Sequence, residues 1–176
     1  MPNKQALHEF QNRLAMRLQS ARSTGVMASW LAVEVDKLRL LLPLSHAGEI
    51  FAWTAPQKVP YTQGWFLGVA NLRGGLSGVA DLAAFIAGRS PRARSEAELA
   101  QCRLVMLNPL LETNCALLVD RLTGLRTLDA FASSESPGAQ APEYFGHLYT
   151  DMNGAHWQEI NLQTLSQTPG FIAIGI

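Results

Sequence analysis

A chain of 176 residues of which 48% are hydrophobic has enough apolar material for one domain, or for two small ones that share a core, and is not wholly disordered. Its 14 Lys and Arg residues balance its 14 Asp and Glu residues, which argues against a nucleic-acid partner, because phosphate binding relies on a basic surface. No apolar signal sequence begins the chain, and the longest uncharged run, residues 160–176, is too polar and too short to span a bilayer. We therefore expect a cytoplasmic protein without direct membrane insertion.

The first segment, residues 1–25, is predicted to be an amphipathic helix. Its apolar residues recur at steps of three and four, which places them on one face of a helix. This stripe consists of Leu7, Phe10, Leu14, Leu18 and Ala21. The segment has four cations and one anion, a net charge of +3, whereas the chain after Arg126 has five anions and no Lys or Arg. The helix either packs on the rest of the protein or binds a partner, and the sequence leaves both possibilities open.

Residues 26–176 form the second predicted unit, in which short apolar runs alternate with turn residues. In chain order we predict a hairpin at 30–44, a turn or helical piece at 45–51, an irregular stretch at 52–64, strands at 65–72 and 76–80, and a helix that Asp81 caps and Gly88 ends. An exposed connection at 89–98, a hairpin with strands at 102–108 and 115–120, a mobile loop at 127–142, a hairpin at 147–162 that turns at Asn153-Gly154, and a strand at 171–176 follow. Many short strands and few helices favour barrels or a sandwich.

No metal site and no cofactor are expected. The four histidines form no pair with ligand spacing, and although His46 and Glu49 lie on one predicted turn, nothing supplies a third ligand. Cys102 and Cys115 are not spaced for a metal site or for a disulfide across their predicted hairpin. We predict that both are buried free thiols in a reducing compartment.

The glycine-rich stretch at 68–88 invites three enzymatic interpretations, and each lacks a required part. A phosphate-binding loop needs Lys and Ser or Thr after its second glycine, but Gly75 and Leu76 stand there. A dinucleotide fingerprint would need another glycine spacing. A nucleophile elbow around Ser77 would need a glycine where Val79 stands. A small serine hydrolase that uses Ser77 remains the alternative to a protein without catalysis, whose function is carried by surface shape and a few charges.

The run from residue 68 to residue 82, G-V-A-N-L-R-G-G-L-S-G-V-A-D-L, resembles the signature of CheW-like coupling proteins. Seven residues fall on signature positions, namely Gly68, Asn71, Leu72, Arg73, Gly74, Asp81 and Leu82. The resemblance extends from about residue 28 to the C-terminus through Glu49-Ile50, residues 117–125 and residues 159–162. Gly78 replaces the family's proline and Ser77 its usual aliphatic residue. These departures, the chain length and the extra N-terminal helix resemble the adaptor of type IV pilus chemosensory systems, the PilI type, which controls twitching motility.

The resemblance implies a mainly β fold of two intertwined five-stranded SH3-like barrels that share a hydrophobic core, and it implies no catalysis. Proteins of this family bridge the cytoplasmic tip of a chemoreceptor to the regulatory domain of a CheA-type histidine kinase, in receptor arrays at the membrane. We therefore expect a signalling adaptor with these two partners, recruited to polar arrays.

The resemblance also implies which residues meet those partners. Arg73 and Glu49 are the polar positions expected to make contact, although an internal bond from Arg73 to Asp81 or to a loop carbonyl is an equal alternative. Five further positions match apolar contacts or the receptor-facing groove of the family: Leu42, Ala47, Cys102, Arg103 and Leu125. Gly68, Gly74 and Asp81 are interpreted as architectural, for close backbone approach, a turn and a helix cap.

Overall fold

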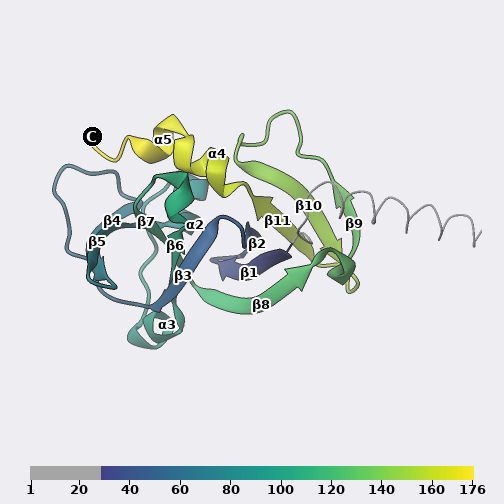
Figure 1. Ribbon diagram of the computed structural model, residues 1–176, viewed down its shortest axis with the longest axis horizontal. Coiled ribbons are helices and arrows are strands. Elements are labelled where there is room, and N and C mark those ends of the chain that lie inside the picture. The colour runs from purple at the N-terminus through teal and green to yellow at the C-terminus, as the bar shows by residue number, and fades with distance from the viewer. Residues whose placement is uncertain (1–28) are drawn as a thin grey trace, which may run out of the picture.

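Two β-sheets form the framework of residues 29–176, the part of the chain that the computed structural model describes (Figure 1). The helix predicted at residues 1–25 lies outside the described residues. The strands are β1 (Ser29–Val35), β2 (Leu38–Pro43), β3 (Ala47–Ala52), β4 (Phe66–Leu72), β5 (Gly75–Asp81), β6 (Arg103–Leu107), β7 (Cys115–Val119), β8 (Arg121–Thr127), β9 (Phe131–Glu135), β10 (Phe145–Asp151) and β11 (His156–Ile160). The helices are α2 (Leu82–Ala87), α3 (Glu96–Gln101), α4 (Leu162–Gln167) and α5 (Pro169–Ile172).

The chain passes from one sheet to the other and back. The six-stranded sheet has the order β8-β1-β2-β11-β10-β9, so its strands come from both ends of the described chain. The five-stranded sheet, with the order β3-β6-β7-β5-β4, is built from the middle. The two sheets are therefore intertwined, as the sequence predicts, with one strand more than expected in the first.

Three apolar clusters fill the molecule, and single strands contribute to two of them. In β1, Leu31 and Val33 face a large cluster between the sheets, whereas Trp30 and Ala32 face a cluster inside the six-stranded sheet. The strand β7 likewise divides its side chains between the shared cluster and a third cluster inside the five-stranded sheet. Successive side chains of a strand point to opposite faces, so strands that are buried on both faces have the nearly continuous apolar sequences seen in 30–35 and 115–119.

The local predictions for the buried hairpins and for the central helix are confirmed. The pairs β1–β2, β4–β5, β6–β7 and β10–β11 are all antiparallel neighbours. The carboxylate of Asp81 accepts the N–H of Ala84, and Gly88 ends α2 in the left-handed conformation. Both cysteines are buried and free.

Four predictions at exposed segments are wrong. Residues 45–51, predicted as a turn or helical piece, contain strand β3, and the predicted loop at 127–142 contains β9, which pairs with β10. The connection at 89–98 is not wholly exposed, because the side chain of Arg94 is buried. The predicted strand at 171–176 is absent: its first two residues end α5, which begins at Pro169, a residue favoured in the first helical turn, and only Gly175 makes an isolated bridge, to Thr62.

Candidate partner-binding site

The tight turn between β4 and β5 presents Arg73 to solvent. Leu72 pairs with Gly75, and the two residues between them, Arg73 and Gly74, have φ of 52° and 76°. Two successive left-handed residues are what the preferred two-residue hairpin turn requires, and glycine adopts this conformation without strain. At the other end of the motif, Gly68 has φ of 131°, and a side chain there would lie 2.1 Å from the carbonyl oxygen of Gln57.

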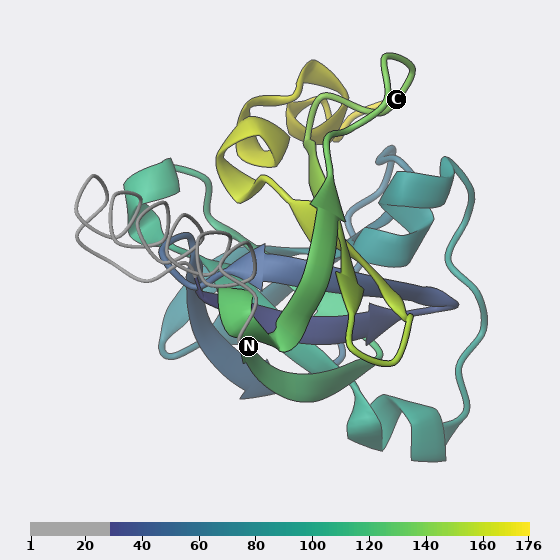
Figure 2. The same ribbon diagram turned by 90° about the vertical axis from the view of Figure 1, so that its right-hand side faces the viewer.

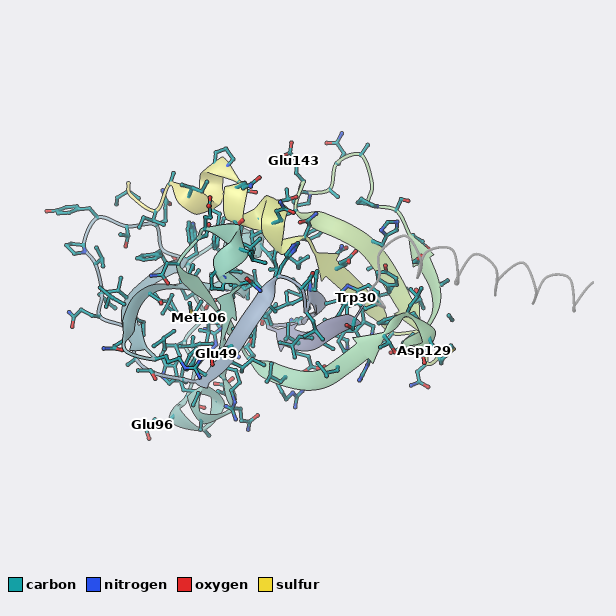
Figure 3. All side chains as sticks on the ribbon, in the orientation of Figure 1. Trp30, Glu49, Glu96, Met106, Asp129 and Glu143 are labelled. Carbon is teal, nitrogen blue, oxygen red and sulfur yellow. The ribbon has the colours of Figure 1, made fainter. Side chains whose placement is uncertain are left out.

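Arg73 forms an ion pair with Glu49 of β3, at 2.5 Å between Nη1 and Oε1. In the order of the five-stranded sheet, β3 and β4 are the two outermost strands, so this contact joins opposite edges of the curled sheet. Figure 3 shows Glu49 on β3. The two side chains remain 74% and 47% exposed, and an ion pair this exposed contributes at most about 1 kcal/mol. Both charges are therefore accessible to a partner at little cost to the fold.

Asp81, the alternative partner proposed for Arg73, is bound by Arg94 instead. The guanidinium of Arg94, whose side chain is 5% exposed, donates to Asp81 at 2.7 Å and to Asp120 at 2.6 Å. Burial opposes the charged form of Arg94, but the hydrogen bonds that its guanidinium donates to the two carboxylates outweigh this effect and raise the pKa of Arg94 above its usual value. Because Asp120 follows β7 and Asp81 ends β5, Arg94 fastens the connection at 89–95 to the five-stranded sheet. The sequence around Arg94 looks like a solvated loop and gives no signal of this role.

Ser77 has no catalytic surroundings. Its side chain is buried, and its hydroxyl donates to the Oδ1 atom of Asn114 at 2.8 Å, an amide that cannot act as a general base. The neighbouring Gly78 donates its N–H to the carbonyl of Asn114 at 3.1 Å, and a Cβ there would lie 3.0 Å from the ring of Phe66. A proline at this position would lose that hydrogen bond, which explains the glycine physically.

The other expected contact positions differ in exposure. Leu125 is 62% exposed, and Ala47 is half-buried. Arg103 is half-buried as well, and its guanidinium donates to the carbonyls of Ala100 and Cys102. The side chains of Leu42 and Cys102 are fully buried in the core, so the structure gives these two a packing role in place of the expected partner contact. Burial also raises the pKa of the Cys102 thiol, which disfavours the thiolate.

Three apolar side chains, on β3, on β8 and directly after β2, are exposed to solvent. The outermost strands β3 and β8 approach each other near one end in both views (Figures 1 and 2). Leu125 of β8 and Ile50 of β3 are paired with two residues of the shared core, Leu31 and Val105 respectively, and so lie on the core-facing side of their sheets. Leu125 is nevertheless 62% exposed and Ile50 43% exposed. Leu44, 37% exposed, follows β2 directly. We call Leu44, Ile50 and Leu125 the junction rim.

Glu49 precedes Ile50 in β3, so the ion pair with Arg73 lies next to the junction rim. An apolar patch bordered by charged groups is typical of protein–protein interfaces. Within residues 29–176 no group of His, Cys, Asp and Glu side chains is arranged to hold a metal ion. No helix in the same range is long and apolar enough to cross a membrane.

The comparisons with known proteins decide the family. The profile described as CheW-like domain matches residues 29–168. The chain belongs to the CheW-like family. Among solved structures, it is similar to the scaffolding protein TtCheW from Thermoanaerobacter tengcongensis, with a TM-score of 0.61 and 16% identity over 77% of this chain and 89% of that one. At this identity the likeness shows the fold alone, the pair of SH3-like barrels. No curated protein matches the chain.

Membership of the CheW-like family supports a role as a scaffold or adaptor and fits a protein that is not an enzyme. The family match begins at residue 29, the first described residue, and ends at residue 168. Residues 1–28 therefore precede it.

Proposed function

We propose that this CheW-like protein is a non-enzymatic adaptor that couples the cytoplasmic tip of a methyl-accepting chemoreceptor to the regulatory domain of a CheA-type histidine kinase. The observation that carries the proposal is the exposed Glu49–Arg73 pair beside the junction rim. An adaptor needs a surface that holds a partner and stays soluble without it. Exposed apolar side chains and a solvated ion pair together meet both needs, because the charges keep the free surface hydrated and select the partner that can pair with them.

In this proposal the junction rim contacts apolar side chains of the receptor, and Arg73 binds a carboxylate or backbone carbonyls of a partner through its planar guanidinium. We assign to the same partner-binding region Ala47, the first residue of β3, and Arg103, the first residue of β6, both of which are half-buried. The buried Ser77 and its amide partner give the alternative of a serine hydrolase no support.

We further propose that the system served is a type IV pilus chemosensory system that controls twitching motility, with the adaptor recruited to receptor arrays at the cell pole. The support is the segment of 28 residues that precedes the family match, together with Gly78 and Ser77 at positions where the family has other residues. Deletion of the gene should abolish twitching zones on agar while pili are still assembled. Unchanged twitching would contradict this assignment and leave the adaptor role standing.

The adaptor role is tested by Arg73→Glu in co-precipitation and titration with the receptor's cytoplasmic fragment and the kinase. Reversing a charge that pairs across an interface costs about 2 kcal/mol or more, about a thirtyfold rise in Kd. Arg121→Glu is the matched control, because Arg121 is also exposed and also bound to one carboxylate, that of Glu34. Unfolding curves should be alike for both variants. Equal affinity of wild type and Arg73→Glu for both partners would exclude Arg73 from the interface.

A charge swap separates a partner contact from an internal one. In Arg73→Glu combined with Glu49→Arg, the ion pair between β3 and the β4–β5 turn is restored with its polarity reversed. If Arg73 only closed the five-stranded sheet, the double variant would recover binding. We expect binding to stay weak, because the partner's carboxylate then faces a negative charge at position 73 in place of the guanidinium.

A further inference from the structure

A cavity of about 390 Å³ lies between the start of β2 and the start of β11 in the six-stranded sheet. The two strands are parallel neighbours at only two pairs, Gln158 with Leu40 and Glu159 with Leu41. The residues before these pairs are not joined to each other, and the cavity is lined from both sides of the gap. Its lining includes Lys37, Leu38, Arg39, Leu148, His156 and Gln158, and it contains no Asp or Glu. A cavity of this volume is large enough for a small ligand or a short peptide segment.

Two cations of the lining have no carboxylate partner among residues 29–176. This part of the chain contains eight arginines, and seven of them donate to a carboxylate or to a backbone carbonyl within it. The exception is Arg39, whose guanidinium lies 5.9 Å from the centroid of the Trp157 ring. No hydrogen bond or ion pair engages the side chain of Lys37 in the same range. The cavity therefore presents two positive charges whose donors are free.

The carboxylates near these cations are bound to other groups. Asp151, which feels the charge of Arg39, accepts three hydrogen bonds within its own hairpin. Glu34, opposite Arg39 in the β1–β2 ladder, is bound to Arg121. The carboxylate before Lys37, that of residue 36, is bound by the guanidinium of residue 89 at 2.7 Å. The hydrogen bonds that the lining cations can donate are thus left for a carboxylate from another molecule.

We propose that this cavity binds an extended acidic peptide segment of a protein partner, in which two carboxylates at alternate positions meet Lys37 and Arg39. Lys37 directly precedes β2 and Arg39 is its second residue, so the two cations are two positions apart. In an extended peptide, side chains at alternate positions lie on one face and about 6.6 Å apart. Two such carboxylates can therefore reach both cations at once, while an apolar side chain of the peptide rests on Leu38 and Leu148.

The ring of Trp157 prepares Arg39 for this role. A guanidinium held over an indole ring by a cation–π contact loses less freedom when it binds a carboxylate. Its planar fork of N–H groups also matches the two oxygens of a carboxylate. Arg39 is thus the expected anchor of the peptide, and Lys37 the flexible second contact.

A peptide fits this lining better than a nucleic acid does. Binding of a phosphate backbone relies on many cations, whereas the lining has two permanent ones and the whole chain has no net charge. The leucines of the lining favour a ligand that also brings an apolar side chain. The cavity belongs to the six-stranded sheet and the Glu49–Arg73 pair to the five-stranded sheet. The proposal therefore adds a second contact surface and does not rest on the proposed function.

The test is a titration of the isotope-labelled full chain, followed through its amide NMR chemical shifts, with the capped peptide Thr-Glu-Val-Glu-Val-Thr. We expect saturable shifts centred on residues 37–39 and 154–158. The control peptide Thr-Glu-Glu-Val-Val-Thr has the same composition and charge, but its carboxylates point to opposite faces when it is extended. It should bind about fivefold more weakly, the loss that corresponds to one exposed ion pair.

Lys37→Gln and Arg39→Gln should each weaken binding of the first peptide about fivefold. Lys58→Gln is the matched control, because Lys58 is also exposed, has no ion pair among residues 29–176 and does not line the cavity. Its affinity should equal that of wild type. Lys37→Gln, in the β1–β2 turn, keeps the test decisive if Arg39→Gln loosens the packing over Trp157.

Equal affinity for the two peptides, or an equal loss of affinity in Lys58→Gln, would overturn the proposal in favour of unspecific charge attraction. A single-stranded oligonucleotide that binds at the same residues more tightly than the first peptide would overturn it as well. Shifts of these residues on raising the protein concentration alone would assign the cavity to a second copy of the chain. Arg73→Glu should bind the peptide like wild type, so a failure of the receptor and kinase experiments leaves the cavity proposal standing.

Discussion

Removal of Arg94 should destabilise the fold more than removal of any exposed arginine among residues 29–176. In Arg94→Ala, Asp81 loses its cation while its carboxylate stays fully buried, and it keeps only the N–H of Ala84. Removing one member of a buried ion pair costs about 3–5 kcal/mol, because the remaining charge is left without compensation. Asp120 is partly exposed and retains Arg92 at 3.4 Å. We therefore expect the lower end, about 3 kcal/mol.

Urea unfolding of the full chain, followed by tryptophan fluorescence, measures this loss. Asp81→Asn is the companion variant: its amide oxygen still caps α2, but its NH2 group faces the guanidinium of Arg94, which then keeps only Asp120, so the variant should cost about 1–3 kcal/mol. The double variant should be more stable than the sum of the two losses predicts, since no unpaired carboxylate then remains at position 81. Arg121→Ala, which breaks an exposed pair, should cost at most about 1 kcal/mol. If Arg94→Ala unfolds within about 1 kcal/mol of wild type, the role assigned to its buried guanidinium is refuted.

Two further predictions concern the backbone and acid stability. Gly68→Ala should lower the free energy of urea unfolding by more than about 2 kcal/mol, because the added Cβ would lie 2.1 Å from the carbonyl oxygen of Gln57. Gly88→Ala has free space around its Cβ and should cost only the roughly 1 kcal/mol of its left-handed backbone. Equal losses in the two variants would contradict the overlap argument. The Ser95 N–H is the main group that lowers the pKa of Glu98 to about 2 from 4.5. The charged form of Glu98 therefore contributes its full stabilisation above about pH 4.5, and this contribution is lost as the pH falls toward 2. Glu98→Gln should flatten the curve of stability against pH in that window, and an unaltered curve would contradict this.

The sequence predicts those parts of the fold whose signals are local. The Asn153-Gly154 turn, the Asp81 cap and the Gly88 end each depend on the conformational preference of one or two residues, and the structure has all three. Strands β3 and β9 escaped prediction because no residue of β3 and only one of β9, Phe131, is buried. A half-buried strand is recognised by an apolar residue at every second position, and this alternation is absent from both segments.

The residues of the candidate site could be predicted only where they belong to a recognisable sequence motif. Arg73 and Glu49 were singled out through the resemblance to the CheW-like family, but their mutual contact joins strands that are far apart in the sheet order. Arg94 meets carboxylates 13 and 26 residues away, and no spacing rule connects them. Leu44 and Ile50 look like core residues in the sequence. Their exposure could not be predicted, because it depends on how the two sheets adjoin.

The interleaved path of the chain has a consequence for biosynthesis. The pair β1–β8 joins segments about 90 residues apart, and Arg121 reaches Glu34 across 87 positions. Such high contact order slows folding, because a long loop must close before its contacts repay the loss of entropy. While the ribosome makes the middle of the protein, the β1–β2 hairpin has emerged with apolar side chains on both faces and no β8 or β11 to pair with. The six-stranded sheet cannot be completed before β8–β11 have been made, so the nascent chain is a natural client for chaperones until its last third has been synthesised.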